Sequence, residues 1–208
     1  MAHADVQTHR SFWSQAWQTL GAQGDGTALR AQLWAAYAEP QRRYHTQQHL
    51  LECLHALDRV REQVREAAAI EIALWFHDAI YELQGKDNEA RSAAWAAQAL
   101  RDAGAPSDRA EQVQRLVLAT RHQALPQAED EAWLVDIDLA ILGAEPARFA
   151  EYEAQIRAEY SFVPEALFRA KRAELLRSFL ARPFIYSTAC LRAQLEERAR
   201  GNLRQALA

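Results

Sequence analysis

The chain has few of the residues that cross-link or interrupt a fold: its 208 residues include 2 Cys, 6 Pro, 7 Gly and 1 Met. Cys53 and Cys190 are too far apart for a disulfide framework or a zinc finger, so we expect both to be small buried apolar residues. No run of eighteen apolar residues is present, which argues against a membrane-spanning helix. The first ten residues lack the pattern of a secretion signal. These absences predict a cytoplasmic protein.

A surplus of positive charge is also missing. The formal net charge is -4 at pH 7, whereas proteins that bind nucleic acid through its phosphates usually carry a basic surplus. General binding to a nucleic acid duplex is therefore not expected.

Strong helix formers dominate the sequence. Ala, Leu, Glu, Gln and Arg are abundant, and no long alternating run of Val, Ile, Thr or Tyr suggests a sheet. The length suits one domain with a sizeable core. The sequence therefore predicts an all-α fold of roughly ten helices in a single domain, residues 1–208. Periodicity, capping residues, Gly and Pro place the helices at residues 6–20, 27–38, 45–63, 66–81, 88–103 (with Asp87 as N-cap), 107–121, 129–142, 146–160, 164–180 and 187–207.

The most informative feature is the pair His77 and Asp78, which follows an apolar helical run at residues 70–76. Burying a carboxylate beside an imidazole is costly unless something compensates it. A divalent cation does so, because it binds neutral imidazole nitrogen and carboxylate oxygen together. Taken alone, the dipeptide favours a simpler interpretation, a His–Asp hydrogen bond at a helix end.

Three more histidines bear on this choice. His45 and His49 stand four residues apart near the start of a predicted helix, so both imidazoles can point into one cavity. Such a pair is also common on a solvated helix face. His122 ends the helix predicted at 107–121, where a histidine often only interacts favourably with the helix terminus.

Two acidic residues, Asp136 and Asp138, enter the otherwise apolar helix predicted at 129–142. Residues two apart diverge by roughly 200° around a helix, so only one of them points at a given site. We favour Asp138, because apolar residues follow it. Asp136 would then be a cap-like or surface residue, although Asp138 could also make only a local hydrogen bond.

In order, His49, His77–Asp78 and Asp138 resemble the signature of the HD-domain superfamily of metal-dependent phosphohydrolases. The segment from Tyr44 to His49 is similar to the corresponding motif of cyclic-nucleotide phosphodiesterases. The wider pattern, from about residue 43 to 203, looks like a bacterial family of predicted HD phosphohydrolases.

The resemblance implies an HD-type helical bundle, with a metal-site core at about residues 43–143 and C-terminal helices at 145–207 packed on it. It also implies a divalent metal ion, which could be Mn, Fe, Co, Ni, Zn or Mg, because such sites accept several metals. The implied ligands are His49, His77, Asp78 and Asp138, with His122 as the candidate for an additional one. The adjacent His-His pair of strictly two-metal members is missing, so the number of metal ions stays open.

The resemblance assigns catalytic roles as well. Asp78 or Asp138 could orient or deprotonate the attacking water, and His45 matches the position of a general acid. Glu89 could supply a further carboxylate, although an acidic residue in a helix's first turn explains it equally well. The catalytic Glu-Asp pair of alarmone-hydrolysing members does not follow His77–Asp78.

Substrate phosphate requires cations beyond the metal, and guanidinium groups suit it. Arg43 is the nearest candidate in sequence, and Lys86, Arg91 and Arg121 are further ones. Tyr160 is the candidate substrate contact from the C-terminal part.

The sequence thus predicts a metal-dependent phosphohydrolase that cleaves a phosphate ester or anhydride of a nucleotide or similar small molecule. The expected partner is a small phosphorylated substrate, with no nucleic acid duplex and no membrane; a homodimer stays open. The alternatives are a di-iron HD-fold oxygenase and a non-catalytic helical ligand-binding module.

Overall fold

A computed structural model describes residues 12–122 and 124–208, and its regular structure over these residues is entirely helical. The predicted all-α, single-domain fold is therefore confirmed. Residues 12–19 form the described part of the first helix, and its predicted start at residue 6 lies outside the described residues. The other elements are α2 (Thr27–Ala36), α3 (Gln47–Val60), the 3-10 turn η1 (Arg61–Gln63), α4 (Ala67–Phe76), α5 (Asn88–Asp102), α6 (Ser107–Ala119), α7 (Glu129–Asp138), the 3-10 turn η2 (Leu139–Gly143), α8 (Pro146–Glu159), α9 (Glu165–Leu180) and α10 (Ala189–Ala206).

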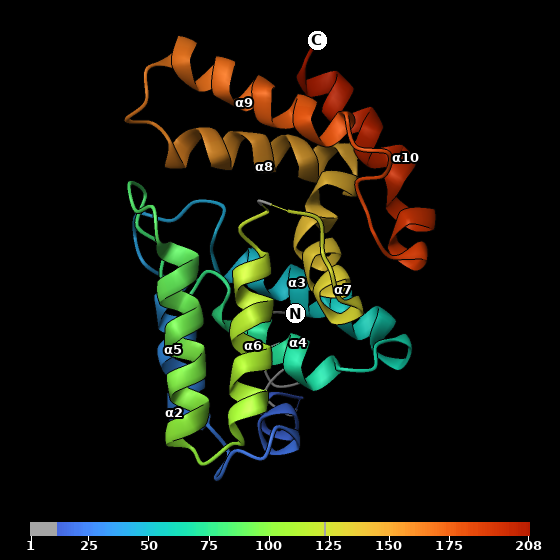
Figure 1. Cartoon of the computed structure of the whole chain (residues 1–208). Helices are drawn as coiled ribbons and strands as arrows, with labels where there is room; N and C mark the ends of the chain where they lie inside the picture. Colours follow the sequence, from blue (N-terminus) through green and yellow to red (C-terminus); the bar gives the residue numbers. More distant parts are fainter. Residues whose placement is uncertain (1–11, 123) are drawn as a thin grey trace.

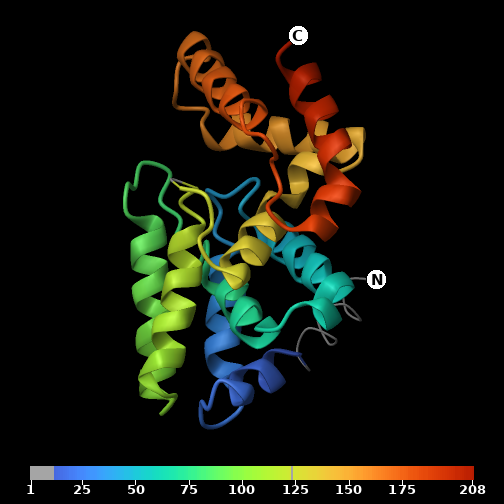
Figure 2. The ribbon, with the colours of Figure 1, turned by 45° about the vertical axis from the view of Figure 1, so that its right-hand side comes forward.

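The helices form a lower and an upper group (Figure 1). In both ribbon views, α2, α5 and α6 lie in the lower group, and α8, α9 and α10 form the upper group (Figures 1 and 2). Helices α5 and α6 pack along each other, α6 packs against α4, and α10 packs against η2. Because α7 and η2 run directly into α8, the C-terminal part of α7 lies where the two groups meet.

Helix α4 is the central element of the lower group. Every residue from Ala69 to Phe76 is buried. Burying each large side chain, such as Ile70 or Leu74, contributes roughly 1.5–3 kcal/mol. The apolar sequence of α4 therefore anchors the polar residues that follow it.

The sequence predicts that this helix continues to Tyr81, but α4 ends at Phe76. The physical reason is Arg42, a buried residue from the loop before α3. Its guanidinium donates to the carbonyl of Asp78 (2.6 Å) and to that of Ala79 (3.1 Å). These carbonyls therefore find partners outside a helix, and the chain leaves the helical path at the His–Asp pair.

Other predicted boundaries also shift. Helix α3 begins at Gln47 because the Thr46 side chain caps it by accepting from the Gln48 N–H, which leaves His45 in the preceding loop. Asp87 stands at the N-cap position of α5, but its side chain makes no capping hydrogen bond. The Asn88 side chain instead holds the preceding loop, through two hydrogen bonds with the Glu82 backbone.

The helix predicted at 129–142 is divided, with α7 ending at Asp138 and η2 following it. Asp136 is fully buried and accepts hydrogen bonds from Ser187 N, Thr188 N and Thr188 Oγ1 at 2.6–2.8 Å. It therefore caps the start of α10 rather than lying on the surface. Among the described residues, no helix combines the length and apolar character needed to cross a membrane.

Candidate metal centre

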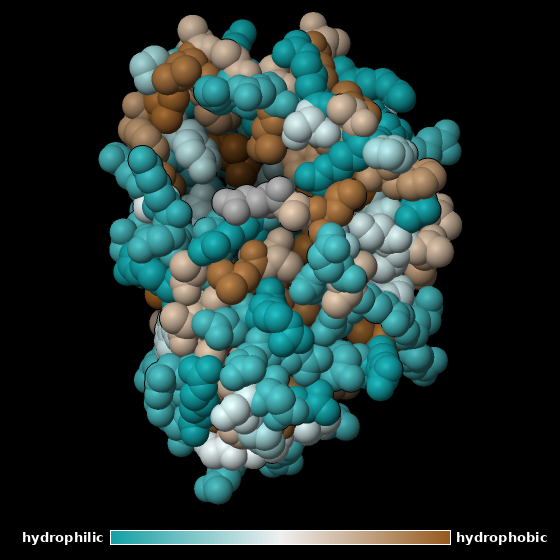
Figure 3. Space-filling view, viewed as in Figure 1, coloured by the Kyte–Doolittle hydropathy of each residue, from teal (hydrophilic) through white to brown (hydrophobic). Residues whose placement is uncertain are grey.

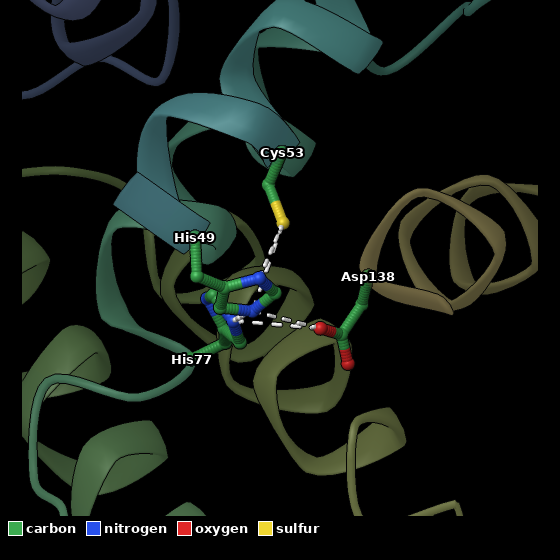
Figure 4. Close-up of side chains that lie close together, drawn as sticks. All are labelled: His49, Cys53, His77 and Asp138. Carbon is green, nitrogen blue, oxygen red and sulfur yellow. Dashed lines mark hydrogen bonds and ion pairs between the residues drawn. The ribbon is translucent and has the colours of Figure 1, made fainter. Parts of the chain in front are cut away.

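Three helices bring one group of ligand atoms together. His49 comes from the first turns of α3, His77 and Asp78 follow α4, and Asp138 is the last residue of α7. Ligand atoms of His49, Cys53, His77 and Asp138 all lie within 4.8 Å of one another, and these side chains point toward a common centre (Figure 4). This group could hold a metal ion.

The Asp78 carboxylate also faces this centre. Its Oδ2 lies 3.0 Å from His77 Nε2 and 3.7 Å from His49 Nε2. Asp138 Oδ1 lies 3.2 Å from His49 Nε2 and 3.6 Å from His77 Nε2, and the two Nε2 atoms are 3.1 Å apart. Atoms that share one ion at about 2.1 Å lie roughly 3.0–3.5 Å apart. These distances, 3.0–3.7 Å, are close to that range, so His49, His77 and Asp138 could share a divalent cation, with Asp78 or Cys53 as a further ligand.

The protonation of His77 supports the same assignment. Its Nδ1 lies 2.7 Å from the Leu74 carbonyl, which can only accept, so Nδ1 carries a proton. When the ring loses its other proton, as a metal ligand must, the lone pair is on Nε2, which faces His49, Asp78 and Asp138. A backbone carbonyl on the opposite nitrogen is a usual support of a metal-binding histidine.

Tyr37 fixes the same segment from the side of the core. Its hydroxyl donates to the Leu74 carbonyl (3.3 Å) and accepts from the Asp78 N–H (3.2 Å). The contact joins α2's C-cap residue to the turn that carries both His77 and Asp78. The two ligands are thus held before any ion binds.

The carboxylates at the centre attract positive charge. Burial alone would raise the pKa of both carboxyls, but His77 and His45 hold the pKa of Asp78 below its usual value. His122 and His49 do the same for Asp138. Burial would lower the pKa of His77, yet Asp78 and Asp138 raise it to about 9. Two half-buried carboxylates thus attract positive charge, which a proton or a metal ion can supply.

His122 lies next to this set. Its Nε2 is 3.0 Å from Asp138 Oδ2, whereas Oδ1 of the same carboxylate faces His49 and His77. Its backbone is in the left-handed region (φ 53°), which is uncommon for a residue with a side chain. His122, the predicted additional ligand, therefore contacts the Asp138 oxygen that does not face His49 and His77.

Cys53 belongs to the group, although the sequence predicts only a buried apolar role. It lies one helical turn after His49, and its Sγ is 3.7 and 3.8 Å from the two ring nitrogens. Burial raises the pKa of the thiol, so the neutral form is favoured. The sequence signal that could have identified Cys53 is its position four residues after the predicted ligand His49, on the same face of the helix.

His45 lies at the edge of the centre and is held by Glu159, the last residue of α8. Its Nδ1 donates to Glu159 Oε2 at 2.7 Å, and Tyr81 donates to the same oxygen at 3.0 Å. Glu159 Oε1 accepts the backbone N–H groups of residues 43–45 at 2.8–3.1 Å. Glu159 therefore fixes both the loop and the imidazole, and no local sequence pattern identifies it.

Arg43 lies away from the centre. Its guanidinium donates to the carbonyls of Pro40 and Arg42, and its side chain is exposed. The neighbouring Arg42 is the residue that faces inward, where it holds the Asp78 and Ala79 carbonyls. The structure therefore does not bring Arg43 to the place that its predicted phosphate-binding role requires.

A cavity beside the centre shares part of its wall with a second, polar cavity. His45, His122 and Asp138 line a cavity of about 690 Å³, which opens between α8–α9 and the rest of the molecule, and the face shown in Figure 3 is hollowed there. Arg121 and Tyr160 line this cavity and also a second, polar one of about 370 Å³.

The polar cavity is lined by Lys86 and Glu89 as well. Glu89 thus shares a cavity with Arg121 and Tyr160 and does not belong to the group around the metal ligands. Arg121 and Tyr160, by contrast, stand where a molecule bound at the centre would extend.

Comparison of the sequence with protein-family models, with curated proteins and with solved structures finds no match. The assignment of function therefore depends on the site itself.

Proposed function

We propose that this protein is a metal-dependent phosphohydrolase of the HD type. The observation that carries the proposal is the convergence of four side chains, with ligand atoms 3.0–3.7 Å apart: His49, His77, Asp78 and Asp138. His45 and a cavity lie beside them. The chain order of these residues is that of the HD signature. The all-helical fold is compatible with it.

His49, His77, Asp78 and Asp138 would hold the divalent cation, which would supply a lowered pKa for bound water and stabilisation of negative charge on a phosphoryl group. Asp78 is partly accessible, with 17% of its side chain exposed, so it can orient an attacking water and accept its proton. Arg121 is exposed in the cavity wall and can pair with phosphate oxygens.

His45 is suited to protonate the leaving oxygen. Because Nδ1 is bound to the Glu159 carboxylate, the proton available for transfer is on Nε2. Burial would lower the pKa of His45, but the carboxylates of Asp78 and Glu159 raise it above its usual value. The imidazolium therefore persists to higher pH than that of a free histidine.

The test is elemental analysis of the purified protein and of Asp78→Asn, together with phosphate release from a panel of phosphate esters and anhydrides after addition of Mn, Fe, Co, Ni, Zn or Mg. We expect near-stoichiometric metal and turnover in the native protein and the loss of both in the variant. Asp108→Asn is the matched control, because Asp108 is exposed in the first turn of α6.

A native protein that takes up no metal and releases no phosphate would contradict the proposal and favour a helical ligand-binding module. A di-iron oxygenase would instead show visible absorption from bound iron. Within the described residues, His122 lies 3.0 Å from Asp138 and could add one ligand, whereas a second iron requires several; this supports hydrolysis over oxygenation.

A further inference from the structure

The cavity beside the centre has two chemically different ends. The inner end carries His45, His122 and Asp138, whereas the wall formed by η2, α8 and α9 is mostly apolar. Its volume of about 690 Å³ lies within the range of about 300–1,000 Å³ that suits small-molecule ligands. The apolar side chains that matter here are Leu142, Ile156, Leu167, Phe168, Leu175 and Phe179.

The charged groups of this wall are engaged. Arg172 pairs with Glu153 and stacks over the Tyr152 ring. Lys171 pairs with Glu174 at 2.8 Å, and 70% of its side chain is exposed. The wall therefore offers little to the hydroxyl groups of a sugar, whose transfer from water without hydrogen-bond partners is costly.

Two of the apolar side chains are left open to water. Leu167 is 52% exposed and Leu175 is 45% exposed, and both stand on the cavity side of α9. Tyr44, which lies between the centre and the cavity, has a buried hydroxyl without a hydrogen-bond partner in the described part of the chain. A ligand with a polar group at the centre and a hydrocarbon body would cover the two exposed leucines.

We infer that the substrate is a phosphate monoester of an apolar alcohol, with the phosphate at the metal centre and the hydrocarbon in this cavity. The inference rests on the proposed function and replaces the expected nucleotide. Arg121, in the wall of both cavities, contacts the phosphate, and the apolar side chains of η2, α8 and α9 contact the hydrocarbon.

Direct binding tests the cavity without any turnover. Methyl-, butyl- and octylphosphonate, whose carbon–phosphorus bonds resist hydrolysis, would be titrated into the metal-loaded full chain by calorimetry below their aggregation concentrations. Each buried methylene tightens binding about fourfold, so octylphosphonate should bind on the order of a hundredfold more tightly than butylphosphonate. A dissociation constant that does not change along the series would overturn the inference.

The variant Leu175→Asp tests whether the dependence of affinity on chain length arises in this cavity. Because Leu175 is partly exposed on α9, the variant can fold, and it should weaken octylphosphonate binding at least about tenfold while leaving methylphosphonate unchanged. Phe184→Asp, at an exposed apolar residue outside the cavity, is the control and should change neither. Equal losses in the two variants would contradict the assignment of the cavity.

Hydrolysis of the matching alkyl phosphates separates this inference from the function on which it rests. Phosphate release that rises with chain length supports both. Release that is equal for methyl, octyl and nucleoside phosphates keeps the hydrolase and overturns the apolar substrate. Chain-length-dependent phosphonate binding without hydrolysis of any ester keeps the apolar ligand and overturns the hydrolase.

Sedimentation velocity tests whether a second copy of the chain covers these side chains instead. A dimer that Leu175→Asp dissociates would assign them to that interface and exclude the inference.

Discussion

His45 Nδ1 donates to Glu159 Oε2 at 2.7 Å and so links the loop before α3 to the end of α8, 114 residues later in the chain. Burial would raise the pKa of Glu159, but hydrogen bonds from His45 and from the backbone hold it at about 2. The carboxylate is therefore ionised at neutral pH and stabilises the protonated imidazole. This pair makes the C-terminal helices part of the proposed active site.

Glu159→Gln should reduce kcat about tenfold to hundredfold, because the amide cannot stabilise the imidazolium that donates the proton. The His45 pKa, raised in the native protein, should fall, so the alkaline limb of the pH–rate profile should move to lower pH. Steady-state kinetics across pH 5–9 would measure both effects.

The control for this substitution is Glu151→Gln, a half-exposed carboxyl on the same helix. In the double variant with His45→Ala, little further loss is expected, because both substitutions remove the same proton donor. A Glu159→Gln protein that melts like the native one and keeps its pH profile would show that Glu159 only holds the loop.

Cys53→Ser should keep near-stoichiometric metal, whereas Asp78→Asn should lose metal affinity by about a hundredfold or more. The Cys53 sulfur lies at nearly equal distances from both His49 nitrogens, and burial disfavours its thiolate. Asp78 is ionised and faces both Nε2 atoms. Competition with a metal-sensitive dye would compare the two variants, and a larger loss in Cys53→Ser would make the thiolate a ligand in place of Asp78.

The fold class could be predicted because helix formers, Gly and Pro act locally along the chain. The ends of the helices could not, because distant residues decide them. Arg42 ends the helical path after Phe76 by binding carbonyls 36 and 37 residues away. Asp136 is buried because the start of α10, about 50 residues later, supplies three hydrogen-bond donors.

The site also combines residues that local sequence patterns identify with residues that only distant contacts bring into place. His49, His77, Asp78 and Asp138 carry a recognisable order and spacing, and the structure brings all four together. Glu159 has no such pattern, because its role depends on where α8 crosses the loop at His45.

Asp136→Ala should destabilise the protein by about 2–4 kcal/mol, since it leaves the capping donors of α10 unpaired in a buried place. Asp136→Asn keeps an acceptor and should cost less. Urea unfolding would measure both. Under native conditions the Asn variant should still bind metal, because Asp136 does not belong to the metal-ligand group. Equal stability of Asp136→Ala and the native protein would show that α10 docks without this cap.

Glu71 gives the fold a defined dependence on pH. It is fully buried in the apolar helix α4, where its carboxylate pairs with Arg61 and its Oε1 has no partner among the described residues. Burial outweighs the attraction of Arg61 and raises the pKa of Glu71 to about 7. In the unfolded chain the same carboxyl titrates near its ordinary value of 4.5.

Between these two pKa values the folded chain binds more protons than the unfolded chain, so the contribution of Glu71 to stability falls as pH rises from about 4.5 to 7. Glu71→Gln removes this titration. The free energy of unfolding of the variant relative to the native protein should therefore rise across this window, by on the order of 3 kcal/mol at most, and stay constant above it.

Urea unfolding at pH 5, 6, 7 and 8 would measure the difference, with Glu62→Gln as the control, because Glu62 is exposed on η1 and should show no such trend. The loss of the Arg61 ion pair shifts the Glu71→Gln curve by an amount that does not vary with pH, so the slope carries the information. A difference that is flat, or that falls with pH, would show that Glu71 stays ionised in the folded chain and that its pairing with Arg61 outweighs its burial.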